Sequence, residues 1–147
     1  MKSIVVGYDG SDASKRALLR AAELAETLGT KLAVISVAEP MPMAAEPIVP
    51  GDAIGMTAPG IASLPDTAEA ERELNEAKKA LAERAIEVEY VSTIGDAADA
   101  IVDAAESRDA DLIVVGTRHP GFLDRLFGGD VSEAVSRRSQ RDVLIVH

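Results

Sequence analysis

Short runs rich in Val, Ile and other β-branched residues alternate along the whole chain with longer segments rich in Ala, Leu, Glu and Lys. The runs predict five strands, over residues 3–8, 31–38, 86–93, 111–116 and 142–146. Strict alternation of strands with crossover helices is typical of a parallel sheet flanked by helices on both faces. Since the chain has 147 residues, we expect an α/β fold in a single domain over residues 1–147.

The pattern within the runs indicates where each strand lies. Residues 112–115 and 143–146 are continuously apolar, as in parallel strands that are covered on both faces. Residues 87–91 alternate between acidic and apolar or aromatic side chains, so this strand is expected at a half-exposed edge.

The segments between the runs carry helix start and stop signals. Ser11 or Asp12 is expected to begin a helix that ends before Gly29. Asp66, with Glu69 three residues later, begins a second helix, and Asp96 begins a third. A fourth, short helix is expected over about residues 130–139.

One segment interrupts the alternation. Residues 39–65 contain six of the seven Pro and three of the four Met. A loop of this length is usually either functional or disordered. Two interpretations stay open: a mobile insertion, or a lid over a ligand cleft or apolar surface for a protein partner, since Met and Ile are unusual in solvated linkers.

Composition excludes several classes of function. The net charge of −10 disfavours binding to the phosphate backbone of nucleic acids, and 3% aromatic residues leave few side chains for stacking on bases. The chain has no Cys, which excludes disulfides, thiolate zinc sites and thiol nucleophiles. No targeting segment and no apolar stretch of membrane-spanning length is recognisable, so we expect a cytoplasmic protein without nucleic-acid or membrane partners.

Ligands of open parallel sheets bind beyond the carboxyl ends of the strands. The first predicted strand is followed there by Asp9, Gly10 and Ser11. Asp9 is placed to accept hydrogen bonds from a ribose or to orient a metal ion. Alternatively, Asp9 and Ser11 only satisfy the N–H groups of a turn and a helix start.

A glycine-rich stretch follows the fourth predicted strand. Gly128 and Gly129 lead directly into a helix N-terminus, where free N–H groups favour an anion. Residues 116–141 contain five Arg and three acidic residues, although the whole chain is acidic. The stretch predicts a phosphate site, or otherwise a glycine-rich turn beside a solvated basic face.

Motifs of several enzyme classes are absent from the sequence. It contains no G-x-x-x-x-G-K-[ST], no G-x-G-x-x-G and no G-x-S-x-G. His119 has no identifiable nucleophile partner, so no catalytic residues are predicted.

Four segments, over residues 5–11, 111–118, 129–135 and 142–146, resemble the universal stress protein family, and the similarity extends over essentially the whole chain. The resemblance implies a three-layer α/β/α sandwich of the adenine nucleotide alpha hydrolase-like type, with a five-stranded parallel sheet in the order 3-2-1-4-5. It also implies a homodimer that pairs through the last strand, over Val143, Leu144, Ile145 and Val146.

Many members of this family bind ATP or another adenine nucleotide, and the resemblance places such a site on Asp9, Val37, Gly116, Arg118, Gly129, Asp130, Val131 and Ser132. Asp9 matches the acid near the ribose, and Val37 matches the residue whose backbone meets the adenine. Gly116 and Gly129 fit the first and third glycines of the phosphate motif G-2x-G-9x-G-[ST]. The chain departs from this motif at His119, in place of the second glycine, and at Asp130, in place of Ser or Thr.

Asp130 weakens the expectation of a phosphate site. At about 4 Å and an effective dielectric constant of about 20, its charge repels each phosphate charge by about 4 kcal/mol. Arg118 and Arg125, or a Mg²⁺ ion held by Asp9 and Asp130, would compensate. We favour an alternative in which Asp130 is the N-cap of the last helix. AMP or a cyclic nucleotide is then penalised less than ATP.

The leading hypothesis is a homodimeric binding or regulatory module of the stress response that binds an adenine nucleotide. The alternative is a stress protein that needs no nucleotide and acts through protein contacts of the 39–65 loop. A slow ATP hydrolase is a third hypothesis, for which the sequence shows no dedicated residues.

Overall fold

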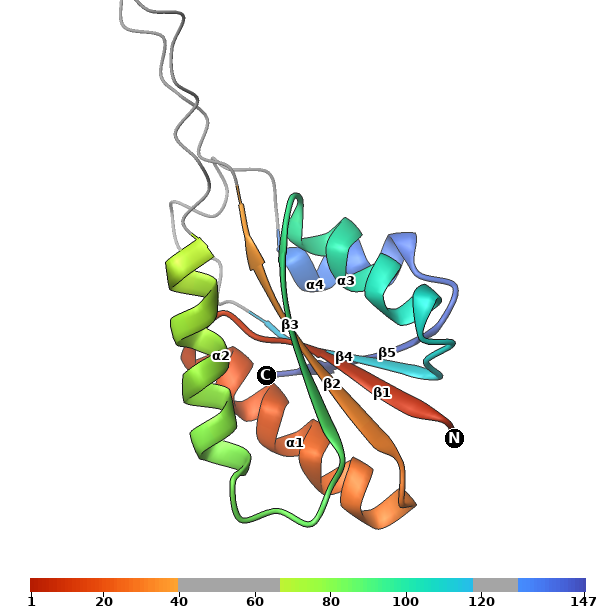
Figure 1. The fold of residues 1–147 in the computed structure, drawn as a ribbon. Coiled ribbons are helices and arrows are strands. Elements are labelled where there is room, and N and C mark those ends of the chain that lie inside the picture. The colour runs from red at the N-terminus through yellow and green to blue at the C-terminus, as the bar shows by residue number, and fades with distance from the viewer. Residues whose placement is uncertain (40–66, 118–129) are drawn as a thin grey trace, which may run out of the picture.

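The computed structural model describes residues 1–39, 67–117 and 130–147. The strands are β1 (Ser3–Gly7), β2 (Lys31–Ala38), β3 (Val88–Ile94), β4 (Leu112–Gly116) and β5 (Asp142–Val146). The helices are α1 (Asp12–Leu28), α2 (Thr67–Leu81), α3 (Ala97–Ser107) and α4 (Val131–Arg138). All neighbouring strands are parallel, and their order is β3-β2-β1-β4-β5, which confirms the predicted topology (Figure 1).

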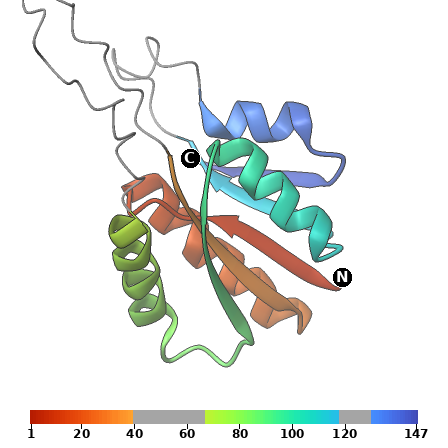
Figure 2. The same cartoon turned by 45° about the horizontal axis from the view of Figure 1, so that its top comes forward.

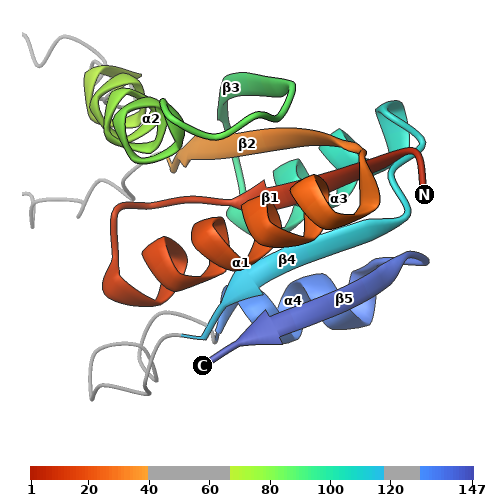
Figure 3. The same cartoon turned by 90° about the horizontal axis from the view of Figure 1, so that it is seen from below.

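The sheet is the middle of three layers, with α1 and α2 on one face and α3 and α4 on the other (Figure 3). Figure 2 shows α3 and α4 together on their side of the sheet. The central strand β1 supplies both apolar layers, because Ile4 and Val6 face α1 whereas Val5 faces α3. All three side chains are fully buried. This confirms the prediction of a sheet covered on both faces.

The predicted helix caps that fall on described residues are present. The Ser11 Oγ accepts a hydrogen bond from the Ser14 N–H at 3.2 Å, and Gly29 ends α1 in the left-handed conformation. The Asp96 carboxylate accepts from the Asp99 N–H at 3.0 Å and begins α3. Asp66 lies outside the described residues. No helix in the described ranges is long and apolar enough to cross a membrane.

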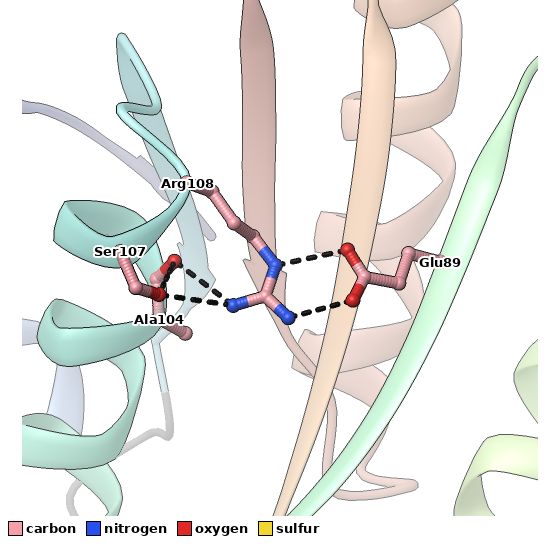
Figure 4. Close-up of polar contacts among 4 residues, drawn as sticks. All are labelled: Glu89, Ala104, Ser107 and Arg108. Atoms are coloured by element: carbon pink, nitrogen blue, oxygen red, sulfur yellow. Dashed lines mark hydrogen bonds and ion pairs between the residues drawn. The ribbon is translucent and has the colours of Figure 1, made fainter.

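The predicted edge strand β3 is confirmed, because its side chains alternate between half-buried and exposed for most of its length. It begins at Val88, two residues later than expected. Arg108, just after α3, binds the edge strand β3. Its Nε and Nη2 donate hydrogen bonds to the two carboxylate oxygens of Glu89 at 3.0 and 2.7 Å (Figure 4). The Arg108 Nη1 also donates to the Ala104 carbonyl oxygen, so one guanidinium links the end of α3 to β3.

The other edge strand, β5, is covered on both faces, as its apolar run predicts, but it is not fully buried. Its apolar residues from Val143 to Val146 are half-buried. They pack against both apolar layers of the core, but β5 has a neighbouring strand on one side alone in the described chain. The continuous apolar run of β5 therefore correctly indicated helices on both faces of the strand, but it did not indicate full burial of its side chains.

Candidate functional site

A cavity of about 370 Å³ lies beyond the carboxyl ends of the central strands. Its walls come from the turn after β1, the ends of β2 and β4, and the first turns of α2, α3 and α4. Its apolar lining includes Ile35, Val37, Ile101 and Val115. The cavity lies where the strand order reverses at β1, which is the usual ligand position in such sheets.

The structure brings most of the predicted site residues that it describes to this cavity. Asp9, Val37, Gly116, Asp130 and Val131 all contribute to its lining. Ser132 is buried at the start of α4 and does not line the cavity. Arg118, His119, Arg125 and Gly129 lie outside the described residues, as does the 39–65 loop except for Glu39.

Asp9 shapes the turn between β1 and α1. Its Oδ1 accepts a hydrogen bond from the Ser11 N–H at 3.0 Å, and its own N–H donates to the Ser14 Oγ at 3.3 Å. Gly10 lies between Asp9 and Ser11 with a φ of +76°, which favours glycine. The turn role expected for Asp9 and Ser11 is thus present, and the same turn places Asp9 at the cavity.

Asp130 is the N-cap of α4, as favoured from the sequence. Its Oδ1 accepts from the Ser132 N–H at 3.1 Å, and its carbonyl oxygen accepts from the Ala134 N–H. A carboxylate at this point interacts favourably with the positive end of the helix. A ligand phosphate at the start of α4 would meet an anion that already occupies this position.

Gly116 has a packing role that the sequence did not reveal. A β-carbon at this position would lie 2.5 Å from the carbonyl carbon and oxygen of Ala13, and 2.8 Å from the Ser14 nitrogen. These are backbone atoms that a side-chain rotation cannot move. The close approach of β4 to the start of α1 therefore requires glycine here, independently of any phosphate.

The described arginines of the basic segment over residues 116–141 do not reach the cavity. Three of its arginines form ion pairs: Arg137 with Glu133, Arg138 with Asp96 and Asp99, and Arg141 with Asp109. None of the three lines the cavity. These three arginines, which the sequence offered as positive charge for a phosphate site, are therefore paired with nearby carboxylates instead.

The α2 side of the cavity was missed by sequence reasoning. Glu69 and Glu73, one helical turn apart, contribute to the lining. The fully buried Ser36 hydroxyl of β2 donates a hydrogen bond to the Glu73 Oε2. Burial raises the pKa of the Glu73 carboxyl above its ordinary value, against the lowering effect of the Ser36 hydrogen bond. A lone hydroxyl within the apolar run of β2 was the available signal for this contact.

Tyr8 makes a second polar link between the sheet and α2. Its hydroxyl donates to the Glu76 Oε2 at 3.3 Å. Burial, followed by the negative charge of Glu76, raises the pKa of Tyr8 to about 12. Tyr8 therefore stays protonated at neutral pH and remains a hydrogen-bond donor to α2.

Carboxylates dominate the polar lining of the cavity. They belong to Asp9, Glu39, Glu69, Glu73 and Asp130. No Lys, Arg or His is present among the described lining residues. Within the same described ranges, no group of three or more acidic or His side chains is arranged to hold a metal ion. The proposed Mg²⁺ bridge between Asp9 and Asp130 therefore has no third ligand of these types there.

A parallel sheet with a ligand-sized cavity at the point of strand reversal is typical of doubly wound α/β proteins. The whole chain, residues 1–147, matches the model of the Universal stress protein family. It is 37% identical over 150 residues to universal stress protein Rv1636 of Mycobacterium tuberculosis, with 99% of this chain and 96% of that protein covered. The chain therefore belongs to the universal stress protein family.

Two solved structures extend this comparison. A universal stress protein in complex with cAMP has a TM-score of 0.73 and 33% identity, covering 99% of this chain and 96% of that one. The universal stress protein from Archaeoglobus fulgidus in complex with dAMP has a TM-score of 0.69 and 26% identity, covering 100% of this chain and 98% of that one.

Proposed function

We propose that this protein is a cytoplasmic regulatory module of the stress response that binds an adenine nucleotide with a short phosphate group, such as AMP or cyclic AMP. The observation that carries the proposal is the cavity at the carboxyl ends of β1, β2 and β4. Its volume of about 370 Å³ falls within the usual range for small-molecule sites. Similar proteins in complex with cAMP and dAMP support the choice of ligand class.

The lining suggests a role for each end of the ligand. The apolar side chains of Ile35, Ile101 and Val115 provide surface for a planar base, and the backbone of Val37 is proposed to bind the adenine edge. Asp9 is proposed to accept hydrogen bonds from the ribose hydroxyls. The phosphate would then lie near Gly116 and the start of α4, where Asp130 disfavours additional negative charge.

Isothermal titration calorimetry with AMP, cyclic AMP and ATP, each with and without Mg²⁺, tests this function. We expect AMP and cyclic AMP to bind more tightly than ATP. Asp9→Asn keeps an oxygen that can accept from Ser11 but removes the charge, and it should weaken binding by roughly 10–100-fold. Asp12→Asn is the matched control, because Asp12 does not line the cavity. Absence of binding in every titration, or equal effects of the two variants, would contradict the proposal.

We further propose that two copies associate through β5. The strand lies at the edge of the sheet, with the half-buried apolar residues Val143, Leu144, Ile145 and Val146. An apolar edge of this kind requires cover to avoid uncontrolled pairing. A second β5 would supply backbone partners and bury the same side chains.

A further inference from the structure

We infer that Glu73 is a specificity-determining residue of the cavity: its carboxylate accepts a hydrogen bond from one of the two ribose hydroxyls and so selects ribonucleotides over their deoxy counterparts. The inference rests on the proposed function, since it assumes that the cavity holds an adenine nucleotide with its ribose at Asp9. It goes further by assigning the second hydroxyl to α2, a helix that carries none of the site residues predicted from the sequence.

The first observation is the position of Glu73 beside the turn that carries Asp9. A β-carbon at Gly10, the next residue in that turn, would lie 3.8 Å from the Glu73 Cγ, so α2 packs against the turn at Glu73. Asp9 and Glu73 both line the cavity. A sugar whose hydroxyls reach Asp9 therefore lies next to Glu73.

The electrostatics of Glu73 agree with this placement. Burial raises the pKa of the Glu73 carboxyl, and the negative charge of Asp9 raises it further. A like charge has this effect at short range, so the two carboxylates belong to neighbouring parts of the cavity wall.

The second observation is the way in which the Glu73 carboxylate is held. Its Oε2 accepts a hydrogen bond from the hydroxyl of Ser36, whose side chain is fully buried in the sheet. Ser36 is the one hydrogen-bond partner of the Glu73 side chain among the residues that the structure describes, which leaves Oε1 for a ligand. Because the carboxylate is already fixed at the cavity, little conformational freedom is lost when Oε1 binds a ligand.

The third observation concerns the chemistry that suits such an oxygen. An ionised carboxylate accepts hydrogen bonds and does not donate them, and a ribose hydroxyl is a donor. The 2′ and 3′ hydroxyls are adjacent on one face of the ribose ring, so acceptors on the two neighbouring parts of the wall can bind one hydroxyl each. A hydrogen bond to a charged acceptor contributes more than one between neutral groups. A ligand that lacks the hydroxyl also leaves the half-buried Glu73 carboxylate without a partner for Oε1.

Calorimetric titrations of the intact protein with AMP, 2′-deoxy-AMP and 3′-deoxy-AMP test the inference. The three compounds share the base, the phosphate and the charge, and they differ in one hydroxyl. We expect each deoxy compound to bind roughly 10–100-fold more weakly than AMP, because each lacks a donor to Asp9 or Glu73. If both deoxy compounds bind as tightly as AMP, the inference is overturned and the proposed function stands. Failure of all three compounds to bind would overturn the proposed function itself.

Glu73→Gln identifies the residue that binds the hydroxyl. Glutamine keeps an oxygen for the Ser36 hydroxyl and presents to the cavity an amide group that cannot accept. The affinity loss for one of the two deoxy compounds should fall to roughly 2–10-fold, and the loss for the other, whose missing hydroxyl is assigned to Asp9, should stay unchanged. Each loss is a ratio measured within one protein, so a change in the folded fraction cancels. If both losses stay at their parent values, Glu73 does not bind a hydroxyl.

Glu76→Gln is the matched control for this variant. Glu76 lies three residues further along α2 and does not line the cavity, and glutamine keeps an oxygen for the Tyr8 hydroxyl. The substitution removes the same charge from the same helix, and both affinity losses should stay at their parent values. Equal changes in Glu73→Gln and Glu76→Gln would indicate a general effect of charge on α2 and would overturn the assignment of Glu73.

Discussion

Gly116 at the end of β4 lies so close to Ala13 at the start of α1 that a β-carbon would meet the Ala13 carbonyl group at 2.5 Å. We therefore expect Gly116→Ala to lower the free energy of unfolding by about 3 kcal/mol, at the upper end of the range for overpacking. Urea denaturation followed by circular dichroism measures this loss. If Gly116 served phosphate binding alone, the variant would keep its stability and lose only affinity.

Gly7→Ala is the matched control for this prediction. A β-carbon at Gly7 would lie 2.7 Å from the Cδ1 of Ile101, the far end of a flexible side chain. Because Ile101 can change its rotamer, the cost should be about 1 kcal/mol. Equal losses for Gly7→Ala and Gly116→Ala would contradict the importance of the backbone contact.

Glu73 should reduce stability at neutral pH. Burial raises its pKa in the folded state above the ordinary value of 4.5, so the folded protein binds the proton more tightly than the unfolded chain does. Stability therefore decreases as the pH rises from about 4.5 through the raised pKa. Glu73→Gln should unfold at a higher temperature than the parent at pH 7, and the difference should vanish below pH 4.5. Thermal scans across this range provide the measurement.

Ser36→Ala separates burial from hydrogen bonding at the same contact. The variant removes the donor to Glu73 and leaves that carboxylate half-buried. We expect a loss of about 1–3 kcal/mol at pH 7, since the hydrogen bond involves a charged acceptor. A neutral effect of Ser36→Ala would show that the hydrogen bond does not stabilise α2 on the sheet.

Glu89 should have the opposite pH dependence to Glu73. The Arg108 hydrogen bonds hold the pKa of the Glu89 carboxyl below its ordinary value of 4.5. Its contribution is therefore present above pH 4.5 and is lost as the pH falls through the lowered pKa. A double-mutant cycle of Glu89→Gln and Arg108→Lys should give a coupling of about 0.2–1 kcal/mol at pH 7, because the Glu89 side chain is 58% exposed and solvent screens the pair. A coupling that persists unchanged in acid or in high salt would contradict this account.

The fold was predictable because its signals are local or periodic. The helix caps at Ser11 and Asp96 each depend on the type of one residue, which the sequence shows directly. The strand order followed from the resemblance to a family. β5 was harder to interpret, because its apolar run looks the same whether the strand is central or at an edge. Sequence periodicity shows which faces are apolar, and it does not show how many neighbours a strand has.

The site was predictable in part for similar reasons. Asp9 lies two residues after the end of β1, and Asp130 directly precedes α4, so the topology alone places both at the carboxyl edge. Glu69 and Glu73 lie on a helix whose angle to the sheet is set by tertiary packing, and their contact with Ser36 spans 37 residues for Glu73. The packing role of Gly116 depends on a distance between two elements and has no signature in the sequence.

The proposed pairing of two β5 strands predicts different effects for proline at adjacent positions. The Val146 carbonyl oxygen accepts from the Thr117 N–H, so Val146 directs its backbone groups toward the β4 side. Backbone groups alternate along a strand, which directs the N–H of Leu144 toward β4 and that of Val143 outward. Proline removes one N–H, and edge strands tolerate it where this group faces outward.

Val143→Pro should therefore keep the β4–β5 pairing and disrupt the dimer, whereas Leu144→Pro should destabilise the fold itself. Light scattering during size-exclusion chromatography measures the mass of each variant, with circular dichroism as the check on folding. We expect the parent to elute at twice the chain mass of 15.4 kDa and Val143→Pro to elute as a folded monomer. A parent that is monomeric at all concentrations, or a folded Val143→Pro that remains dimeric, would contradict association through β5. Because Val143 also packs against the core layer of α3 and α4, Val143→Ala is the control for lost side-chain volume. It should remain dimeric.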